Sequence, residues 1–321
     1  MIALGIESTA HTLGIGIFDD ERMLSNEKKM YVPKFTGIHP RKAAEQHANE
    51  FEGLLKAAIE KAEIKPSEID LVGFAQGPGL GACLKVGVVG AKALALMLNK
   101  PILGVNHCIA HIEISKLYTK TTDPLVVYVS GGNTQIIIKG KDRRYRVLGE
   151  TLDIGLGNLI DVFGRDMGLE KAHGGVIEKM ALGGKYVELP YVVKGMDLSF
   201  TGLQTEAKKK LKEHSQADMC YSLQETSFSM MTEATERALA LTKKSELILC
   251  GGVAQNKRLQ EMLGLMGAEH GAKFGVAPNE FNADNGGMIA YTALYLYKLG
   301  HRMKMSEAKA IQKFRTDQVQ V

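Results

Sequence analysis

The segment of this chain that says most about its architecture is Leu125-Val126-Val127-Tyr128-Val129-Ser130-Gly131-Gly132-Asn133-Thr134-Gln135-Ile136-Ile137-Ile138-Lys139. Two apolar runs enclose a short stretch of small and polar residues. Unbroken apolar runs of this length are typical of buried strands, so the segment predicts a strand, a polar tip and a returning strand. Adjacent glycines let the backbone approach a ligand closely, and Ser, Asn and Thr side chains supply donors. The alternative is an ordinary hairpin turn, in which Gly-Asn is a common pair.

The N-terminus repeats this plan. Residues 2–6 predict a buried strand, Glu7-Ser8-Thr9 a polar tip, and residues 12–18 a second strand that ends in a turn at Asp19-Asp20. We therefore predict an internal duplication in which two hairpin tips face one cleft. The hydroxyls and N–H groups of the first tip suit a phosphate, and the alternative is an ordinary polar turn.

A strand followed by a glycine-rich loop and a helix occurs twice. Residues 70–75 lead into Gln76-Gly77-Pro78-Gly79-Leu80-Gly81 and an apolar helix to about Leu98, and residues 246–250 lead into Gly251-Gly252 and a second helix. This arrangement suits nucleotides, although the first loop has neither the dinucleotide fingerprint nor the Gly-Lys-Ser/Thr of a P-loop. Alternatively, the glycines only let the helix pack close to the sheet.

Apolar periodicity and capping residues predict the other elements. Helices are expected at 41–62, at 155–167, from 173 onward, at 217–241 and at 288–299, with a last strand at 273–276. Lys208, Lys209, Lys210 and Lys212 form a basic helix face, for which a solvated surface is the default interpretation. The C-terminal tail, residues 301–321, is charged and predicts a peripheral segment or the start of a linker.

Two histidines follow a short predicted strand at residues 101–105. His107 and His111 are four residues apart, which on an α-helix places both rings on one face. A strand that ends in such a helix is a good place to hold a metal ion. The alternative is that both are ordinary helix residues.

The composition limits the class of protein. The chain has 321 residues, 45% of them apolar, and a net charge of +4, which is compatible with a nucleic-acid partner. Its four cysteines form no CxxC pair, which indicates buried thiols in a reducing compartment. The longest apolar stretch, residues 86–98, is interrupted by Lys92 and glycine, so we expect no membrane segment and a cytoplasmic protein.

Taken together, these pieces resemble the actin–Hsp70–sugar-kinase architecture, an α/β fold in which two duplicated ribonuclease-H-like halves close over a nucleotide. The chain is also identified as a member of one family by motifs that run in order from Ile2 to about Leu299. These motifs are Gly5-Ile6-Glu7-Ser8-Thr9 with His11-Thr12, Gln76-Gly77-Pro78-Gly79, Leu98-Asn99-Lys100-Pro101-Ile102, His107-Cys108-Ile109-Ala110-His111-Ile112, Val129-Ser130-Gly131-Gly132-Asn133-Thr134, Gly251-Gly252-Val253-Ala254-Gln255-Asn256 and Asn282-Ala283-Asp284-Asn285-Gly286.

The family is the one once named O-sialoglycoprotein endopeptidase, now known as the catalytic subunit of tRNA threonylcarbamoyladenosine synthesis. It is called TsaD in bacteria and belongs to the KEOPS complex in archaea and eukaryotes. The form of residues 128–132 resembles the archaeal–eukaryotic branch. The resemblance implies an N-terminal half at 1–121 and a C-terminal half at 122–300, with a helical insertion at about 150–245.

The resemblance also implies the chemistry. Threonylcarbamoyl-adenylate would bind between the halves, and the amine of the adenosine beside the anticodon of an ANN-decoding tRNA would attack it and release AMP. The implied metal ligands are His107, His111, Tyr128 and Asp284, holding iron or else zinc. The implied nucleotide-binding residues, for this donor or for ATP or AMP, are Tyr128, Val129, Ser130, Gly131, Gly132, Asn133, Asp161, Gly174, Glu178 and Asn256. Glu7, at the first tip, is a candidate proton acceptor.

The implied partners are tRNA, a small kinase or ATPase that some archaea fuse to the C-terminus, and a dimerisation subunit. Three rival functions are weighed. A zincin metalloprotease needs Glu directly after the first histidine, where this chain has Cys108, and Glu113 lies beyond the second histidine. An actin-like ATPase or kinase would leave the histidine pair unexplained. A scaffold or RNA-binding subunit without transferase chemistry is the third.

Overall fold

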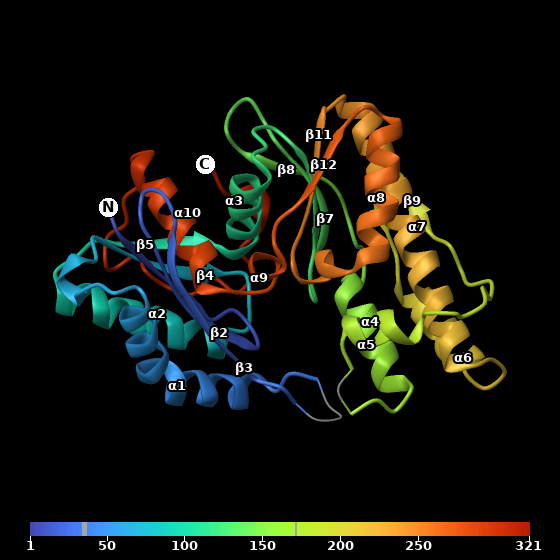
Figure 1. The fold of residues 1–321 in the computed structure, drawn as a ribbon, viewed down its shortest axis with the longest axis horizontal. Helices are drawn as coiled ribbons and strands as arrows, with labels where there is room; N and C mark the ends of the chain where they lie inside the picture. The colour runs from blue at the N-terminus through green and yellow to red at the C-terminus, as the bar shows by residue number, and fades with distance from the viewer. Residues whose placement is uncertain (34–36, 171) are drawn as a thin grey trace.

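The computed structural model describes residues 1–33, 37–170 and 172–321, and it contains two five-stranded sheets (Figure 1). The first sheet has the order β3-β2-β1-β4-β5 and the second the order β12-β11-β6-β7-β8. The strands of the first sheet are β1 (Ala3–Glu7), β2 (Thr12–Phe18), β3 (Met23–Met30), β4 (Leu71–Gly77) and β5 (Ile102–Asn106). Those of the second are β6 (Leu125–Val129), β7 (Thr134–Lys139), β8 (Tyr145–Glu150), β11 (Glu246–Cys250) and β12 (Lys273–Val276), and a separate hairpin pairs β9 (Val193–Lys194) with β10 (Asp197–Leu198).

The two sheets have the same topology. Each begins with three antiparallel strands, and two later strands then pair in parallel beside the first one. This arrangement confirms the predicted duplication and the predicted fold class. The third strand of each half, β3 and β8, was not predicted. Both are edge strands, and β3 reads Met-Leu-Ser-Asn-Glu-Lys-Lys-Met, a polar sequence of the kind that protects an exposed sheet edge.

The helices cover the outer faces of both sheets and fill the layer between them. They are α1 (Pro40–Lys61), α2 (Gly81–Leu98), α3 (His107–Thr119), α4 (Leu156–Asp166), α5 (Gly174–Met180), α6 (Thr201–Lys210), α7 (Gln216–Thr242), α8 (Lys257–Glu269), α9 (Asn279–Asn282) and α10 (Gly286–Lys298), with 3-10 turns at Pro66–Glu68, Gly252–Gln255 and Thr316–Gln318. Helices α1 and α2 lie at one end of the molecule and α7 and α8 at the other (Figure 1).

Strand alternation decides what each sheet face touches. On β6, Leu125, Val127 and Val129 pack in a core with the helices of the second half. Val126 and Tyr128 point the other way, into a central core that also contains residues of α3 and α10. The inner faces of the two sheets are therefore joined through α3 and α10.

Helix α10 departs from the predicted division of the chain. It lies within the predicted C-terminal half, at 122–300, but packs on β1 and β2 of the first sheet. Glycines permit this contact, since a Cβ on Gly5 would lie 2.1 Å from the backbone nitrogen of Ala290, and one on Gly14 would lie 2.6 Å from that of Gly286. The first half is therefore completed by a helix from the end of the chain. The region predicted as a helical insertion holds α4 to α7 and the β9–β10 hairpin.

The C-terminal tail also differs from the peripheral segment that was predicted. The N–H of Ile311 donates to Gln76 O at 2.7 Å in the first half, and Thr316 Oγ1 donates to Gln135 Oε1 at 3.0 Å in the second. Ala308 and Val321 are buried. The many charged side chains of the tail concealed this packing because the tail is anchored mainly through backbone groups and a few small side chains.

By length and composition, α2 is the one helix of the described residues that could cross a membrane, with a mean hydropathy of 1.7. No apolar stretch of membrane length was predicted here. About a third of the helix is buried (33%), and Val88, Ala91 and Ala95 pack in the core of the first half.

Candidate metal and nucleotide site

The histidine pair lies at the start of α3, directly after β5. Asn106 caps this helix, because its Oδ1 accepts from the N–H groups of Cys108 (3.0 Å) and Ile109 (3.2 Å). His107 and His111 then lie one turn apart, both buried, with ring centroids 4.7 Å apart. The predicted helix and its shared histidine face are therefore present.

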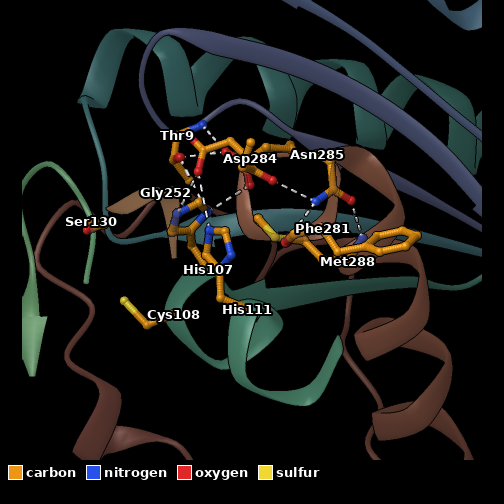
Figure 2. Close-up of polar contacts among 12 residues, drawn as sticks. Thr9, His107, Cys108, His111, Ser130, Gly252, Phe281, Asp284, Asn285 and Met288 are labelled. Carbon is orange, nitrogen blue, oxygen red and sulfur yellow. Dashed lines mark hydrogen bonds and ion pairs between the residues drawn. The ribbon is translucent and has the colours of Figure 1, made fainter. Parts of the chain in front are cut away.

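Asp284 joins the two histidines from the segment that precedes α10. Its Oδ1 lies 3.2 Å from Nε2 of His111 and 3.5 Å from Nε2 of His107. Figure 2 shows the two rings and this carboxylate turned toward one another. One ligand atom from each residue lies within 4.8 Å of the others, so the three side chains form a group that could hold a metal ion.

Tyr128 has the properties of a fourth ligand. It is fully buried, and its Oη has no hydrogen-bond partner among the described residues. Its ring centroid lies 5.6 Å from that of His111. Burial raises the pKa of this phenol well above its ordinary value. An unpartnered buried hydroxyl is costly unless something binds it, so the residues present fit a metal site.

Glu7 lies behind His107. Its Oε2 is 2.9 Å from Nδ1 of His107, and its Oε1 accepts the N–H of Thr9 at 2.7 Å. The side chain is fully buried and is not among the residues that line the cavity. The proton-acceptor role suggested from the sequence would need contact with substrate, and this geometry instead makes Glu7 a partner that orients His107.

The charges in this group depend on one another. Burial lowers the pKa of His107, but the nearby carboxylates of Glu7 and Asp284 outweigh it and raise the pKa to about 9. Burial lowers the pKa of His111 below its ordinary value. Burial alone would raise the pKa of Asp284, but the adjacent histidines bring it well below its usual range. In the absence of a cation, a proton on His107 therefore balances the carboxylates.

A cavity of about 990 Å³ opens between the two halves and reaches the metal-ligand group. His107, Tyr128 and Asp284 line it, and His111 does not. Most of the predicted nucleotide-binding residues line the side formed by the second half: Ser130, Gly131, Gly132, Asn133, Asp161, Gly174, Glu178 and Asn256. Val129 is fully buried and lies outside the lining.

The glycine tip between β6 and β7 is preorganised. Ser130 N donates to Asn133 O at 2.8 Å, and Ser130 Oγ accepts from Asn133 N at 3.1 Å, which closes the turn. A Cβ added to Gly132 would meet no atom within 4 Å, so backbone at this position is open to a ligand. Asn133 Nδ2 contacts Cys108 Sγ at 3.7 Å, linking the tip to the histidine helix.

Three other predicted residues differ in what their polar atoms offer. Asn256 is satisfied within the protein, since its Oδ1 caps α8 and its Nδ2 donates to Gln224 Oε1 at 2.7 Å. Glu178 uses one oxygen to accept from Lys257 N at 2.7 Å. Burial in the cavity wall raises the pKa of Asp161 to about 6, against opposing effects of Arg165 and His11.

Sequence reasoning missed several cavity residues on the first half. His11 and Thr12 line the cavity, and the quoted motif contains them, but nothing assigned them a role. Lys28 and Met30 line it too. Both belong to β3, the edge strand that apolar patterning could not show.

The arrangement of the two halves recurs in solved structures of other proteins. The chain matches Thermococcus kodakarensis HypF with a TM-score of 0.65 at 14% identity, over 96% of this chain and 49% of that one. It matches the activator of the 2-hydroxyisocaproyl-CoA dehydratase from Clostridium difficile with a TM-score of 0.56 at 10% identity, over 94% of this chain and 97% of that one. At such identities the likeness shows the fold alone, so these matches define an α/β protein of the actin-like class.

The sequence comparisons narrow this class to one family. The family model described as "TsaD: tRNA N6-adenosine threonylcarbamoyltransferase" matches residues 22–291. Proteins named tRNA N6-adenosine threonylcarbamoyltransferase are 52% identical in Thermococcus kodakarensis and 49% identical in Archaeoglobus fulgidus, each over 100% of this chain and 99% of the relative. The chain belongs to this family and is a tRNA N6-adenosine threonylcarbamoyltransferase, which confirms the predicted enzyme class.

One further relative is longer. The "Probable bifunctional tRNA threonylcarbamoyladenosine biosynthesis protein" of Methanobrevibacter smithii is 49% identical over 100% of this chain and 60% of the relative.

Proposed function

We propose that this transferase takes threonylcarbamoyl-adenylate as its donor and holds the adenylate along the second half of the cavity. The open tip at Gly132 suits the phosphate, and the carboxylates of Asp161 and Glu178 are suited to ribose or adenine. The same surface would also accept AMP or ATP. The observation that carries the proposal is that His107, Asp284 and the glycine tip all line one cavity.

In the proposed reaction, the N6 amine of the adenosine beside the anticodon of an ANN-decoding tRNA attacks the carbamoyl carbonyl. A carbon–nitrogen bond forms, the bond from that carbon to the phosphate oxygen breaks, and the amine loses a proton as AMP leaves. The protein holds donor and acceptor on opposite sides of one cavity, so the reacting groups meet at a fixed separation.

We propose iron as the resident metal, with zinc as the alternative. His107, His111, Tyr128 and Asp284 would hold it, and a phenol among two imidazoles and a carboxylate favours iron. When bound, such a cation supplies Lewis-acid stabilisation of the charge that develops on the carbonyl. Glu7 orients His107 by accepting from Nδ1, which leaves Nε2 facing the ligand position.

The test is a transfer assay with threonylcarbamoyl-adenylate and an unmodified ANN-decoding tRNA, with and without KEOPS partner proteins. Mass spectrometry of nucleosides measures the product. We expect product from the wild type, little from a His107→Ala/His111→Ala variant, and normal yield from His214→Ala, which removes an exposed histidine between α6 and α7. Full activity of the double variant would exclude the proposed site, and no wild-type product with partners present would exclude the proposed reaction.

We propose that the protein works in the cytoplasm with a kinase or ATPase and a dimerisation subunit. The bifunctional relative supports a second activity beside the transferase, and four buried free cysteines suit a reducing compartment. The dimerisation subunit needs an apolar surface, and α2 offers Val89, Leu96 and Met97, which are 66%, 67% and 81% exposed. Spacings of seven and eight residues place them on one helix face.

A co-purification experiment tests this surface. A Leu96→Lys/Met97→Lys variant should lose the dimerisation subunit, whereas Leu241→Lys, at an equally exposed leucine of α7 (66%), should retain it. Retention by both variants would place the subunit elsewhere.

A further inference from the structure

We propose that the end of β3 and the start of α1 form a docking rim for the anticodon loop of the tRNA. The rim comprises residues 28–32 and 38–42, with Lys28 and Lys42 at backbone phosphates and Met30 and Ile38 against a base. The proposal rests on the proposed function, and it names the surface that receives the acceptor.

The sequence of this region is strongly biased toward cations. Residues 28–44 contain no Asp or Glu, and their basic residues are Lys28, Lys29, Lys34, Arg41 and Lys42. Apolar side chains are interspersed among them, a mixture suited to single-stranded nucleic acid, which offers both phosphates and unstacked bases. Residues 34–36 lie outside the described part of the chain, and the proposal uses none of them.

Strand register aims the end of β3 into the cavity. Met30 pairs with Thr12 and Lys28 with Gly14, and paired residues share a face of the sheet. That face is the one on which Gly14 meets Asn285 and Gly286, next to the metal-ligand Asp284. Lys28, Met30 and Ile38 accordingly line the cavity from the first half.

Three contacts hold the start of α1 beside this strand. Gln46 Nε2 donates to Met30 O at 3.1 Å, His47 Nε2 lies 3.1 Å from Ala10 O at the hairpin tip, and Cys83 Sγ lies 3.6 Å from Pro40 O. The first turn of α1 contains no acidic residue. The positive end of the helix dipole therefore adds to the charges of Arg41 and Lys42. In Figure 1, β3 and α1 lie on the side of the molecule where α4 and α5 face them from the second half.

The charges of the rim remain available, unlike those of the other basic run. Among the described residues, no ion pair involves Lys28, Lys29, Arg41 or Lys42. By contrast, Lys208 Nζ lies 2.7 Å from Asp166 and Lys210 Nζ donates to Glu188 O at 2.8 Å. The basic rim is thus better suited to an anionic partner than the lysine run of α6.

Apolar side chains of the rim are exposed at the cavity mouth. Met30, Val32 and Ile38 are 48%, 56% and 40% exposed. The proposed adenylate occupies the side of the cavity formed by the second half, so the acceptor nucleotide must enter from the opposite side, past these residues. Flexible apolar side chains beside cations match a nucleotide base with its phosphate.

Steady-state transfer kinetics with the full chain and its partner proteins test the rim. Lys28→Glu and Lys42→Glu should each raise KM for the tRNA at least about fivefold, because each replaces an attraction to phosphate by a repulsion. The values of kcat and of KM for threonylcarbamoyl-adenylate should not change. The matched control is Lys65→Glu, an exposed lysine just beyond the opposite end of α1.

Direct binding separates failure of the rim from failure of the reaction. The wild-type chain is titrated with a fluorescent anticodon stem-loop at several salt concentrations. Each lysine variant should reduce the slope of log K against log salt by about one, whereas Met30→Ser should weaken binding without changing the slope. Unchanged KM, affinity and slope in both lysine variants would overturn the proposal, even with an active wild type. If the wild type makes no product, the stem-loop slopes still decide whether the rim binds RNA.

Discussion

Glu7 and His107, which are 100 residues apart in the sequence, are joined by a contact of 2.9 Å between Oε2 and Nδ1. Alternation along β1 places Glu7 on the same sheet face as Gly5, toward α10 and the histidine helix. A carboxylate on Nδ1 fixes the ring orientation and leaves Nε2 facing Asp284, 3.5 Å away. Such partners tune a ligand histidine without touching the metal or the substrate.

We expect Glu7→Gln to lower metal affinity roughly 10- to 100-fold, the usual effect of losing such a partner. Transfer activity should fall and recover when metal is added in excess. Chelator competition measures the affinity. The matched control is Glu113→Gln, a buried carboxylate of the same helix bonded to Tyr145 and Lys116, which should leave metal affinity unchanged. Normal metal affinity combined with lost transfer would instead return Glu7 to the role of proton acceptor.

The contact between α10 and the first sheet leaves no room for a side chain. A Cβ on Gly5 would lie 2.1 Å from Ala290 N and 2.4 Å from Gly286 O, both backbone atoms. We expect Gly5→Ala to reduce the free energy of unfolding by about 3 kcal/mol or more, since the helix must move. Gly53→Ala is the control, because no atom lies within 4 Å of its added Cβ on α1. That change should stabilise the protein by about 0.5–1 kcal/mol in urea denaturation. Equal midpoints for both variants would contradict the packing argument.

These elements also show which features a sequence can reveal. The two hairpin tips and the His107–His111 pair depend on neighbouring residues, so apolar runs and helical spacing were sufficient to predict them. Strand β3 forms only because β2 pairs with it, and its own residues are mostly polar. The position of α10 depends on Gly5 and Gly14, more than 270 residues earlier in the chain. Patterns that are local in sequence carry no information about such contacts. The same reason explains why Glu7 was correctly placed at the first tip but was assigned a role in proton transfer.

Asp161 provides a pH-dependent prediction. Burial raises the folded-state pKa of its carboxyl to about 6, above the model value of 3.8. The folded state therefore binds a proton more tightly than the unfolded state, so this group favours folding below pH 4 and that contribution is lost as the pH rises through 6. Asp161→Asn should stabilise the protein at pH 8, by about 1–3 kcal/mol, and have little effect near pH 4.

Thermal denaturation of Asp161→Asn and wild type at both pH values measures this difference. If Asp161 contacts the ribose, the same variant should bind AMP more weakly at pH 8. A variant that is equally stable at both pH values relative to wild type would show that the carboxyl ionises normally.

Asn106 links the histidine helix to the C-terminal tail. Its Oδ1 caps α3, and its Nδ2 donates to Phe314 O at 3.0 Å and approaches Arg315 O at 3.5 Å. Asn106→Asp keeps the cap, because aspartate is as good a capping residue, but it loses the donor and places a carboxylate against two carbonyls. We expect this variant to release the tail, so that trypsin cleaves at Lys313 and Arg315 at least several-fold faster. Asn106→Ala loses both contacts and should also cost about 1 kcal/mol or more of unfolding free energy from the missing cap. Asn256→Asp, which changes the cap of α8 with no tail contact, controls for a buried charge and should leave cleavage of the tail unchanged. A tail that stays resistant in Asn106→Asp would mean that its bonds to Gln76 and Gln135 suffice to hold it, and that the cap of the metal helix is independent of the tail.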